Sequence, residues 1–131
     1  MNSTYSPSKR TILCIDDDDA ILFYEKALLE SSGYAVITAA SAQQGLRLVS
    51  MCKCDAVLLD YEMPGMNGHE LAKEIKRVRP ELMIVLFSGG NVPTYTLPLV
   101  DAYLPKLEAS RLLLTTIAAV CSKTHITIRD D

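Results

Sequence analysis

The chain has 131 residues, 49% of them hydrophobic and 22% charged, which is the composition of an ordinary globular domain with one core. Its formal net charge of −3 argues weakly against a dedicated nucleic-acid-binding surface. No apolar stretch approaches the roughly 20 residues that span a membrane, and the polar start lacks a signal-peptide core, so we expect no membrane insertion and a cytoplasmic location.

Strand and helix patterns alternate along the chain after a polar tail over residues 1–10. Short apolar runs bounded by polar residues are typical of strands that are buried on both faces of a parallel sheet. Five such runs are found, at residues 11–15, 34–38, 56–59, 83–87 and 102–104. The alternation implies right-handed crossovers and a three-layer α/β sandwich, with one domain over residues 11–123 and a second tail over 124–131.

Apolar residues recur at helical spacing between these strands. The first helix is predicted to begin near Asp19 and to end at Gly33, and its expected inward-facing residues are Ile21, Leu22, Ala27 and Leu28. Three more helices are expected, from the N-cap Ser41 through Val49, from Gly68 to the helix-ending Pro80, and from Ser110 to Cys121.

The segment from Asn91 to Val100 lies where the alternation would place another helix. Pro93 and Pro98 interrupt this segment. Proline lacks an amide hydrogen and its ring clashes with the preceding helical turn. We therefore expect at most one or two irregular turns between the fourth and fifth strands.

Acidic residues stand at the ends of two predicted strands. Asp16 and Asp17 directly follow the first strand, and Asp60 follows the third. Because ligands bind outside the carboxyl ends of the strands in an open parallel sheet, we expect these carboxylates to lie together at the site of function. At about 5 Å and an effective dielectric constant of about 20, each pair repels by roughly 3 kcal/mol. A cation relieves this repulsion, and clustered hard oxygen ligands favour Mg²⁺ or Mn²⁺ over Zn²⁺.

Other residues that could take part in chemistry have a simpler structural interpretation. Asp18 and Asp19 suit the N-cap and first turn of the following helix, where the helix dipole favours negative charge. Cys14 and Cys121 lie inside predicted elements, so we expect the four cysteines to be reduced structural thiols. His69 stands early in a predicted helix and is expected to face solvent.

Polar groups also follow the fourth and fifth predicted strands. Ser88 follows the fourth strand, Lys106 lies beyond the fifth, and residues 63–68 (Met-Pro-Gly-Met-Asn-Gly) come shortly after Asp60. Together with the Asp16–Asp17 pair, these features resemble the receiver domains of two-component response regulators over nearly all of residues 10–123. Each feature alone is a weak signal, but all five in this order are highly specific.

The resemblance implies a flavodoxin-like α/β fold, a three-layer doubly wound five-stranded parallel sheet of order 2-1-3-4-5, with helix 4 shortened or irregular. It makes Asp60 the phosphoacceptor, a carboxylate that forms an acyl phosphate in an Mg²⁺-dependent (or Mn²⁺-dependent) reaction. The implied metal ligands are Asp16, Asp17, Asp60 and the backbone carbonyl of Glu62, and the implied phosphoryl-binding and switch residues are Ser88, Lys106 and Tyr103. The implied partners are a histidine kinase or phosphotransfer protein and a downstream protein target, without direct nucleic-acid contact.

We expect a stand-alone receiver that switches partner binding, and not a classical enzyme, although it would catalyse its own phosphotransfer and a slow autodephosphorylation. A degenerate receiver that binds protein independently of phosphorylation is the alternative. It arises because Leu107 stands where the family usually has proline, and because the stretch from Ser88 to Lys106 is about one helical turn short. A phosphohydrolase of the haloacid dehalogenase type is disfavoured, since Glu62 replaces its second aspartate. A Rossmann domain is disfavoured because no glycine-rich turn follows the first strand.

Overall fold

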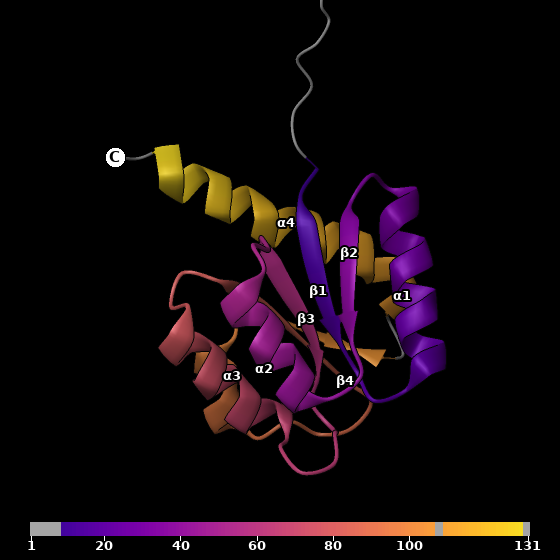
Figure 1. The fold of residues 1–131 in the computed structure, drawn as a ribbon, viewed down its shortest axis with the longest axis vertical. Helices are drawn as coiled ribbons and strands as arrows, with labels where there is room; N and C mark the ends of the chain where they lie inside the picture. Colours follow the sequence, from indigo (N-terminus) through magenta and orange to yellow (C-terminus); the bar gives the residue numbers. More distant parts are fainter. Residues whose placement is uncertain (1–8, 107–108, 130–131) are drawn as a thin grey trace, which may run out of the picture.

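The computed structural model describes residues 9–106 and 109–129, and it describes residues 109, 110 and 123–129 by their backbone alone. The sheet contains β1 (Thr11–Ile15), β2 (Ala35–Ala39), β3 (Ala56–Asp60), β4 (Met83–Ser88) and β5 (Ala102–Pro105). The strand order is β2-β1-β3-β4-β5, and every neighbouring pair is parallel. The predicted fold class and strand order are therefore confirmed (Figure 1).

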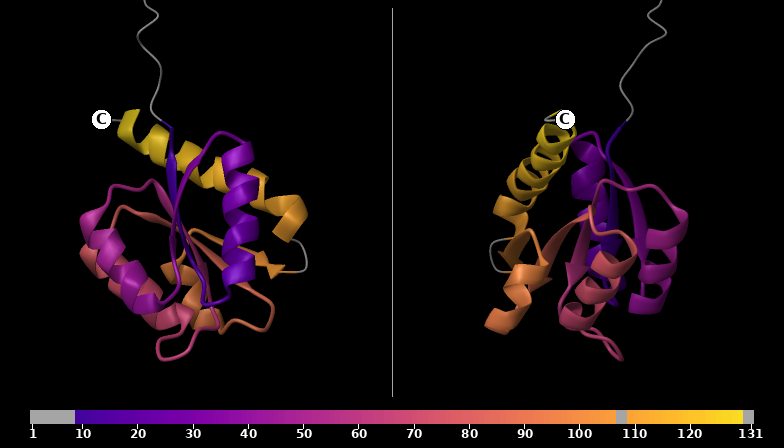
Figure 2. Two further views of the ribbon diagram at one scale, coloured as in Figure 1. Left: turned by 45° about the vertical axis from the view of Figure 1, so that its right-hand side comes forward. Right: turned by 90° about the vertical axis from the view of Figure 1, so that its left-hand side faces the viewer.

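Helices cover both faces of this sheet (Figure 2). One face carries α1 (Asp19–Ser31) and α4 (Ala109–Arg129), and the other carries α2 (Ala42–Met51) and α3 (Gly68–Val78). A short 3-10 helix, η1 (Thr94–Leu99), follows β4 and packs beside α3. This is the doubly wound, three-layer arrangement that the alternation of elements predicted.

Alternate residues of the central strands fill two separate cores. In β1, Leu13 and Ile15 belong to the core under α2 and α3, whereas Ile12 and Cys14 belong to the core under α1 and α4. Every residue of β3 is buried. Because burying a Leu or Ile side chain contributes about 2 kcal/mol, these strands hold their carboxyl ends firmly in place.

Local capping explains where the helices begin and end. Asp18 is the N-cap of α1 and accepts hydrogen bonds from two amides of the first turn, where Asp19 also stands, as predicted. Ser41 caps α2 by accepting a hydrogen bond from the amide of Gln44. Gly33 has φ +96° just past the end of α1, a conformation that favours glycine.

The inner face of α1 differs from the predicted one. Leu22 is buried as expected, but Ala27 faces solvent and Leu29 is buried instead. The third buried residue of this row is Glu25. The buried positions are three and four residues apart, so the row is a regular helical stripe that is rotated relative to the predicted one.

The segment after β4 is irregular, as Pro93 and Pro98 predict. η1 is six residues long and contains Pro98, so the expected irregular turns between β4 and β5 are confirmed. The last helix is longer than predicted, because α4 continues past Cys121 to Arg129 and makes helical a stretch that we expected to be a tail. Among the helices of the described residues, none combines the length and hydropathy that a membrane span requires.

Candidate functional site

The carboxyl ends of β1 and β3 bring three acidic side chains together. These strands are neighbours, with Ile15 opposite Leu59, so the residues that follow them are adjacent. One carboxylate oxygen from each of Asp16, Asp17 and Asp60 lies within 4.8 Å of the other two. The side chains of Asp16 and Asp60 are buried, whereas Asp17 is exposed to solvent. We name Asp16, Asp17 and Asp60 the acidic pocket.

A lysine that follows β5, two strands away from β3 in the sheet, reaches this pocket. Lys106 follows β5, and its Nζ lies 3.2 Å from Oδ1 of Asp60 and 5.4 Å from the centre of the Phe87 ring. Burial lowers the pKa of Lys106, but the charge of Asp60 outweighs that effect and raises it, so the lysine stays protonated. Three carboxylates against one ammonium leave the pocket with excess negative charge.

Two oxygens of the pocket have no hydrogen-bond partner among the described residues. Oδ1 of Asp16 accepts a hydrogen bond of 2.9 Å from the amide of Asp18, but its Oδ2 is buried without a partner. Oδ1 of Asp60 is close enough to Lys106 for an ion pair but lacks a directed hydrogen bond. Buried acceptors without a hydrogen bond are costly, so their presence indicates a functional role.

Burial shifts the pKa values of both buried aspartates. It raises the pKa of Asp16 to about 6, with the Asp18 amide opposing the shift and the charge of Asp60 adding to it. Burial also raises the pKa of Asp60, while the positive charge of Lys106 opposes the rise. Burial therefore makes both carboxyls harder to ionise than an exposed aspartate, and nearby positive charge opposes this effect.

The loop after Asp60 has structural reasons for its glycines. Gly65 has φ +85°, which side-chain-bearing residues rarely adopt. A Cβ on Gly68 would lie 2.7 Å from the Cα of Tyr61, so the chain approaches itself too closely there for any other residue. Asn67 caps α3 in a capping box with Glu70. The turn residues thus fix the path of the loop that leaves the acidic pocket.

Ser88 and Tyr103 both contact the backbone of Gly90. The Ser88 hydroxyl is buried; it accepts a hydrogen bond of 3.1 Å from the Gly90 amide and donates one of 3.3 Å to the Gly90 carbonyl. The Tyr103 hydroxyl donates a long bond of 3.5 Å to the same carbonyl, and its side chain is 38% exposed. Gly90 therefore links the end of β4 to the aromatic residue of β5.

Glu62 lies between the acidic pocket and Gly90. Its amide donates a hydrogen bond to the Asp60 carboxylate. Its side-chain Oε2 is 2.8 Å from the position that a Cβ on Gly90 would occupy. The metal-binding role of the Glu62 carbonyl stays a prediction.

Two residues of this region were not identified from the sequence. We expected His69 to face solvent; its side chain is half-buried, its Nδ1 lies 2.9 Å from Oγ1 of the buried Thr96, and its ring meets that of Tyr95 edge to face at 4.9 Å. Glu25 is buried within α1, and its spacing of three and four residues from Leu22 and Leu29 is the signal that could have revealed it.

Leu107, where the sequence departs from the receiver pattern, lies outside the described residues.

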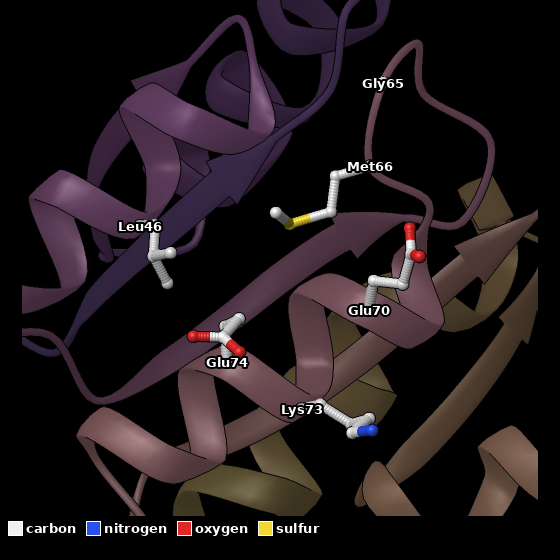
Figure 3. Close-up of a pocket in the computed structure, with 6 residues that line it drawn as sticks. All are labelled: Leu46, Gly65, Met66, Glu70, Lys73 and Glu74. Carbon is white, nitrogen blue, oxygen red and sulfur yellow. The ribbon is translucent and has the colours of Figure 1, made fainter.

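The surface also has a groove beside the acidic pocket's outgoing loop. This groove of about 410 Å³ lies between α2 and α3 and is lined by Leu46, Gly65, Met66, Glu70, Lys73 and Glu74. Figure 3 shows the Met66 side chain extending from the loop toward Leu46. None of the three aspartates lines this groove.

Known proteins share this sequence pattern. Residues 12–117 match the response regulator receiver domain family. The transcriptional regulatory protein CpxR of Escherichia coli is 34% identical over 117 residues, which cover 87% of this chain and 50% of that protein. The transcriptional regulatory protein GlrR of the same species is 39% identical over 83 residues, covering 63% and 19%. The chain thus spans half or less of these curated relatives.

Solved structures share the fold. A CheY-like response regulator receiver domain protein from Methanospirillum hungatei has a TM-score of 0.85 and 30% identity, covering 92% of this chain and 99% of that one. The response regulator protein TrrA from Thermotoga maritima, in complex with Mg²⁺ and BeF, has a TM-score of 0.80 and 27% identity, covering 85% and 98%. With a family match over most of its length and the strand order seen here, this chain belongs to the response regulator receiver domain family.

Proposed function

We propose that this chain is a phosphorylation-controlled switch in the cytoplasm. Asp60 would accept a phosphoryl group from a histidine kinase or phosphotransfer protein, in a reaction that depends on Mg²⁺ or Mn²⁺, and the change would alter binding of a downstream protein. The observation that carries this proposal is the position of Asp60, which is buried with Lys106 at 3.2 Å and the carboxylates of Asp16 and Asp17 within 4.8 Å. A sensor kinase, CckA of Brucella abortus, is among the relatives at 30% identity over 86% of this chain and 13% of its own length.

Asp60 is suited to nucleophilic attack on phosphorus. One of its carboxylate oxygens would form the new bond to phosphorus, while the bond from phosphorus to the donor's histidine nitrogen breaks and the nitrogen keeps the electron pair. Lys106 faces Asp60 before the transfer and can then pair with a phosphoryl oxygen. Asp60 would thus supply the nucleophile and Lys106 a fixed positive charge, and both would act on the same phosphoryl group.

The residues of the acidic pocket fit a divalent cation. They offer hard carboxylate oxygens only, and two buried oxygens, on Asp16 and Asp60, have no hydrogen-bond partner among the described residues. Asp17 and Asp60 would hold the ion directly and Asp16 through water, with the Glu62 backbone carbonyl as a further ligand. When bound, such an ion neutralises charge on the transferring phosphoryl group.

Output would pass through Ser88 to the elements that follow it. Its hydroxyl, now bonded to Gly90, would turn to a phosphoryl oxygen on Asp60 and draw the segment 88–90 inward. Tyr103 contacts the same Gly90 carbonyl and would follow this motion. Four of the seven large exposed hydrophobic side chains of the described residues lie on η1, β5 and α4: Tyr95, Leu97, Tyr103 and Leu112. We propose that this surface binds a protein, and the net charge of −3 disfavours nucleic acid.

A receiver that binds protein without phosphorylation is the alternative. The six-residue η1 between β4 and β5 favours it, because it stands where the alternation of strands and helices would place a full helix. The assembled pocket favours the phosphorylated switch. Three clustered carboxylates, two of them buried, lower stability, and a module that had lost the reaction would gain nothing from keeping them.

Labelling with acetyl phosphate and Mg²⁺ tests the proposal. We expect one phosphoryl adduct by intact-mass spectrometry, located at Asp60 by peptide mapping and missing in Asp60→Asn. Asp19→Asn is the matched control, because Asp19 lies in the first turn of α1 outside the acidic pocket and its variant should be labelled like the parent. Labelling that persists in Asp60→Asn would remove Asp60 from the reaction. A parent chain that stays unlabelled would favour the phosphorylation-independent alternative.

A further inference from the structure

The aromatic ring of Phe87 lies beside the reacting groups of the site. In the sheet, the partner of Phe87 on β3 is Asp60 and its partner on β5 is Leu104. Phe87 and Leu104 belong to the core under α1 and α4, together with Leu58, which precedes Asp60 by two residues. Side chains two positions apart on a strand point to the same face of the sheet. The ring is therefore fixed in a core on the face toward which Asp60 projects.

This ring also contacts the ammonium of Lys106. Nζ of Lys106 lies over the ring of Phe87 at 5.4 Å from its centre, within the roughly 6 Å that is typical of a cation–π contact. The same nitrogen lies 3.2 Å from Oδ1 of Asp60. Phe87 is 5% exposed and the Lys106 side chain 27%, so water screens the contact only in part. The ammonium thus has two partners, and only the ring stays unchanged when the carboxylate reacts.

A flexible side chain such as lysine needs support to hold its charge at one position. Gly89 does not clamp the stem of Lys106, because a Cβ at this position would make only an ordinary contact of 3.5 Å with Cδ, and glycine has no Cβ. The other two carboxylates of the acidic pocket each have an oxygen within 4.8 Å of one from Asp60, so they compete for the ammonium. The buried ring of Phe87 is a rigid group that favours the position facing Asp60.

We propose that Phe87 is a positioning residue for phosphoryl transfer: its ring holds the Lys106 ammonium beside Asp60, so that the positive charge is in place when the phosphoryl group arrives. With acetyl phosphate as donor, an oxygen of Asp60 forms the bond to phosphorus while the bond from phosphorus to the acetate oxygen breaks, and acetate leaves with the electron pair. A charge that is already in place stabilises the transferring oxygens without reorganisation. This inference rests on the proposed function of Asp60 as the phosphoacceptor.

The rate of phosphorylation by acetyl phosphate and Mg²⁺ tests this role in the full chain. F87L keeps an apolar side chain but removes the ring, and we expect it to react about fivefold more slowly than the parent. In a K106M background, which lacks the ammonium, F87L should slow the reaction no further, whereas a general effect on folding would slow both backgrounds equally. V85A is the matched control, because Val85 lies on the same strand and in the same core; it should lose stability but react at the parent's rate.

Fluorination of the ring separates its charge distribution from its shape. The chain has two phenylalanines, Phe87 and the 76% exposed Phe23, so F23L leaves Phe87 as the single site at which a fluorinated analogue is incorporated. The rate should fall stepwise from phenylalanine to its singly and triply fluorinated analogues, because fluorine withdraws electrons from the ring face and weakens its attraction for a cation. The fluorine NMR signal of Phe87 should also shift in K106M.

The fluorinated series decides by itself if F87L does not fold or K106M does not react. Equal rates along this series would overturn the role of Phe87 while leaving Asp60 as the phosphoacceptor. An equal loss of rate on F87L substitution in both backgrounds would overturn it too, since the ring would then act without Lys106. A parent chain that is not phosphorylated would overturn the proposed function of Asp60 as well.

Discussion

At the scale of single residues, Asp16, Asp60 and Glu25 share one physical situation. Each is a buried carboxyl with an oxygen that has no hydrogen-bond partner among the described residues, and burial raises the pKa of each. Such groups lower the stability of the folded state when they ionise. The sheet tolerates them because its two apolar cores supply the stabilisation. The buried carboxyls at this edge of the sheet therefore lower the free energy of unfolding.

The pH dependence of stability should report Glu25. Its pKa of about 8 in the folded chain lies above the roughly 4.3 of an unfolded glutamate, so the folded state binds the extra proton between these values. Stability without metal should therefore be higher at pH 6 and fall by about 2 kcal/mol toward pH 8, as the folded state loses that proton. Asp16 has the same sign, but its contribution is mostly complete near pH 6. Urea unfolding of the parent and of Glu25→Gln at pH 6, 7 and 8 checks this, and a parent with a flat profile would contradict it.

A side chain at position 90 should change the lifetime of phosphorylated Asp60. A Cβ there would meet Oε2 of Glu62 at 2.8 Å, but this is the end of a flexible side chain that can move away, so folding should be little affected. In Gly90→Arg and Gly90→Glu, the new side chain and the displaced Glu62 carboxylate would alter how water reaches the phosphorus. Release of phosphate after labelling measures the lifetime. Gly89→Ala is the control, since its Cβ would make only an ordinary 3.5 Å contact with Lys106. An unchanged lifetime in both variants would show that position 90 does not control access of water.

At the scale of elements, η1 is joined to α3 by the bond between His69 and Thr96. The hydroxyl of Thr96 is fully buried, and the residues it connects are 27 positions apart. His69 lies in the first turn of α3, directly after the loop that leaves Asp60, so this bond connects the far end of that loop to η1. The start of α3 and η1 are thus in direct contact.

Thr96→Val should loosen η1 selectively. It removes the hydroxyl at nearly constant shape and leaves His69 without its partner, which costs about 1 kcal/mol. Exchange of the amides that bond to Pro93 and Leu97, those of residues 96 and 100, should then accelerate about fivefold. Hydrogen exchange by NMR measures this effect, with the exposed Thr94→Val on the same helix as the control. Equal protection in the two variants would mean that the bond does not hold η1.

At the scale of the whole molecule, a divalent cation should stabilise the fold. It relieves repulsion among the three carboxylates of the acidic pocket, which join the ends of β1 and β3. At ten times the dissociation constant, binding contributes about 1.4 kcal/mol, a rise in melting temperature of roughly 2–6 °C for a domain of this size. Asp17→Asn should be more stable than the parent without metal and should show a smaller rise. Thermal unfolding with and without Mg²⁺ tests both effects. A melting temperature that does not change in millimolar Mg²⁺ would argue against a cation site.

The sequence by itself determined the sheet and the identity of its functional edge. Five short apolar runs predicted the strands to within one or two residues, and the residues after them named Asp16, Asp17, Asp60 and Lys106. The two prolines between Asn91 and Val100 predicted the irregular η1. These features are local: a run of apolar residues, a cap or a proline restricts the backbone whatever surrounds it.

Only the tertiary structure decided which polar side chains became buried and which met. The inner row of α1 passes through Glu25 because of how the helix rests on β1 and β2, and the helical pattern alone was compatible with a rotated face. His69 meets Thr96, and Lys106 meets Asp60, across 27 and 46 positions of chain. Such contacts depend on how distant elements pack against each other, and burial of a charged group is a property of that packing and not of its neighbours in sequence.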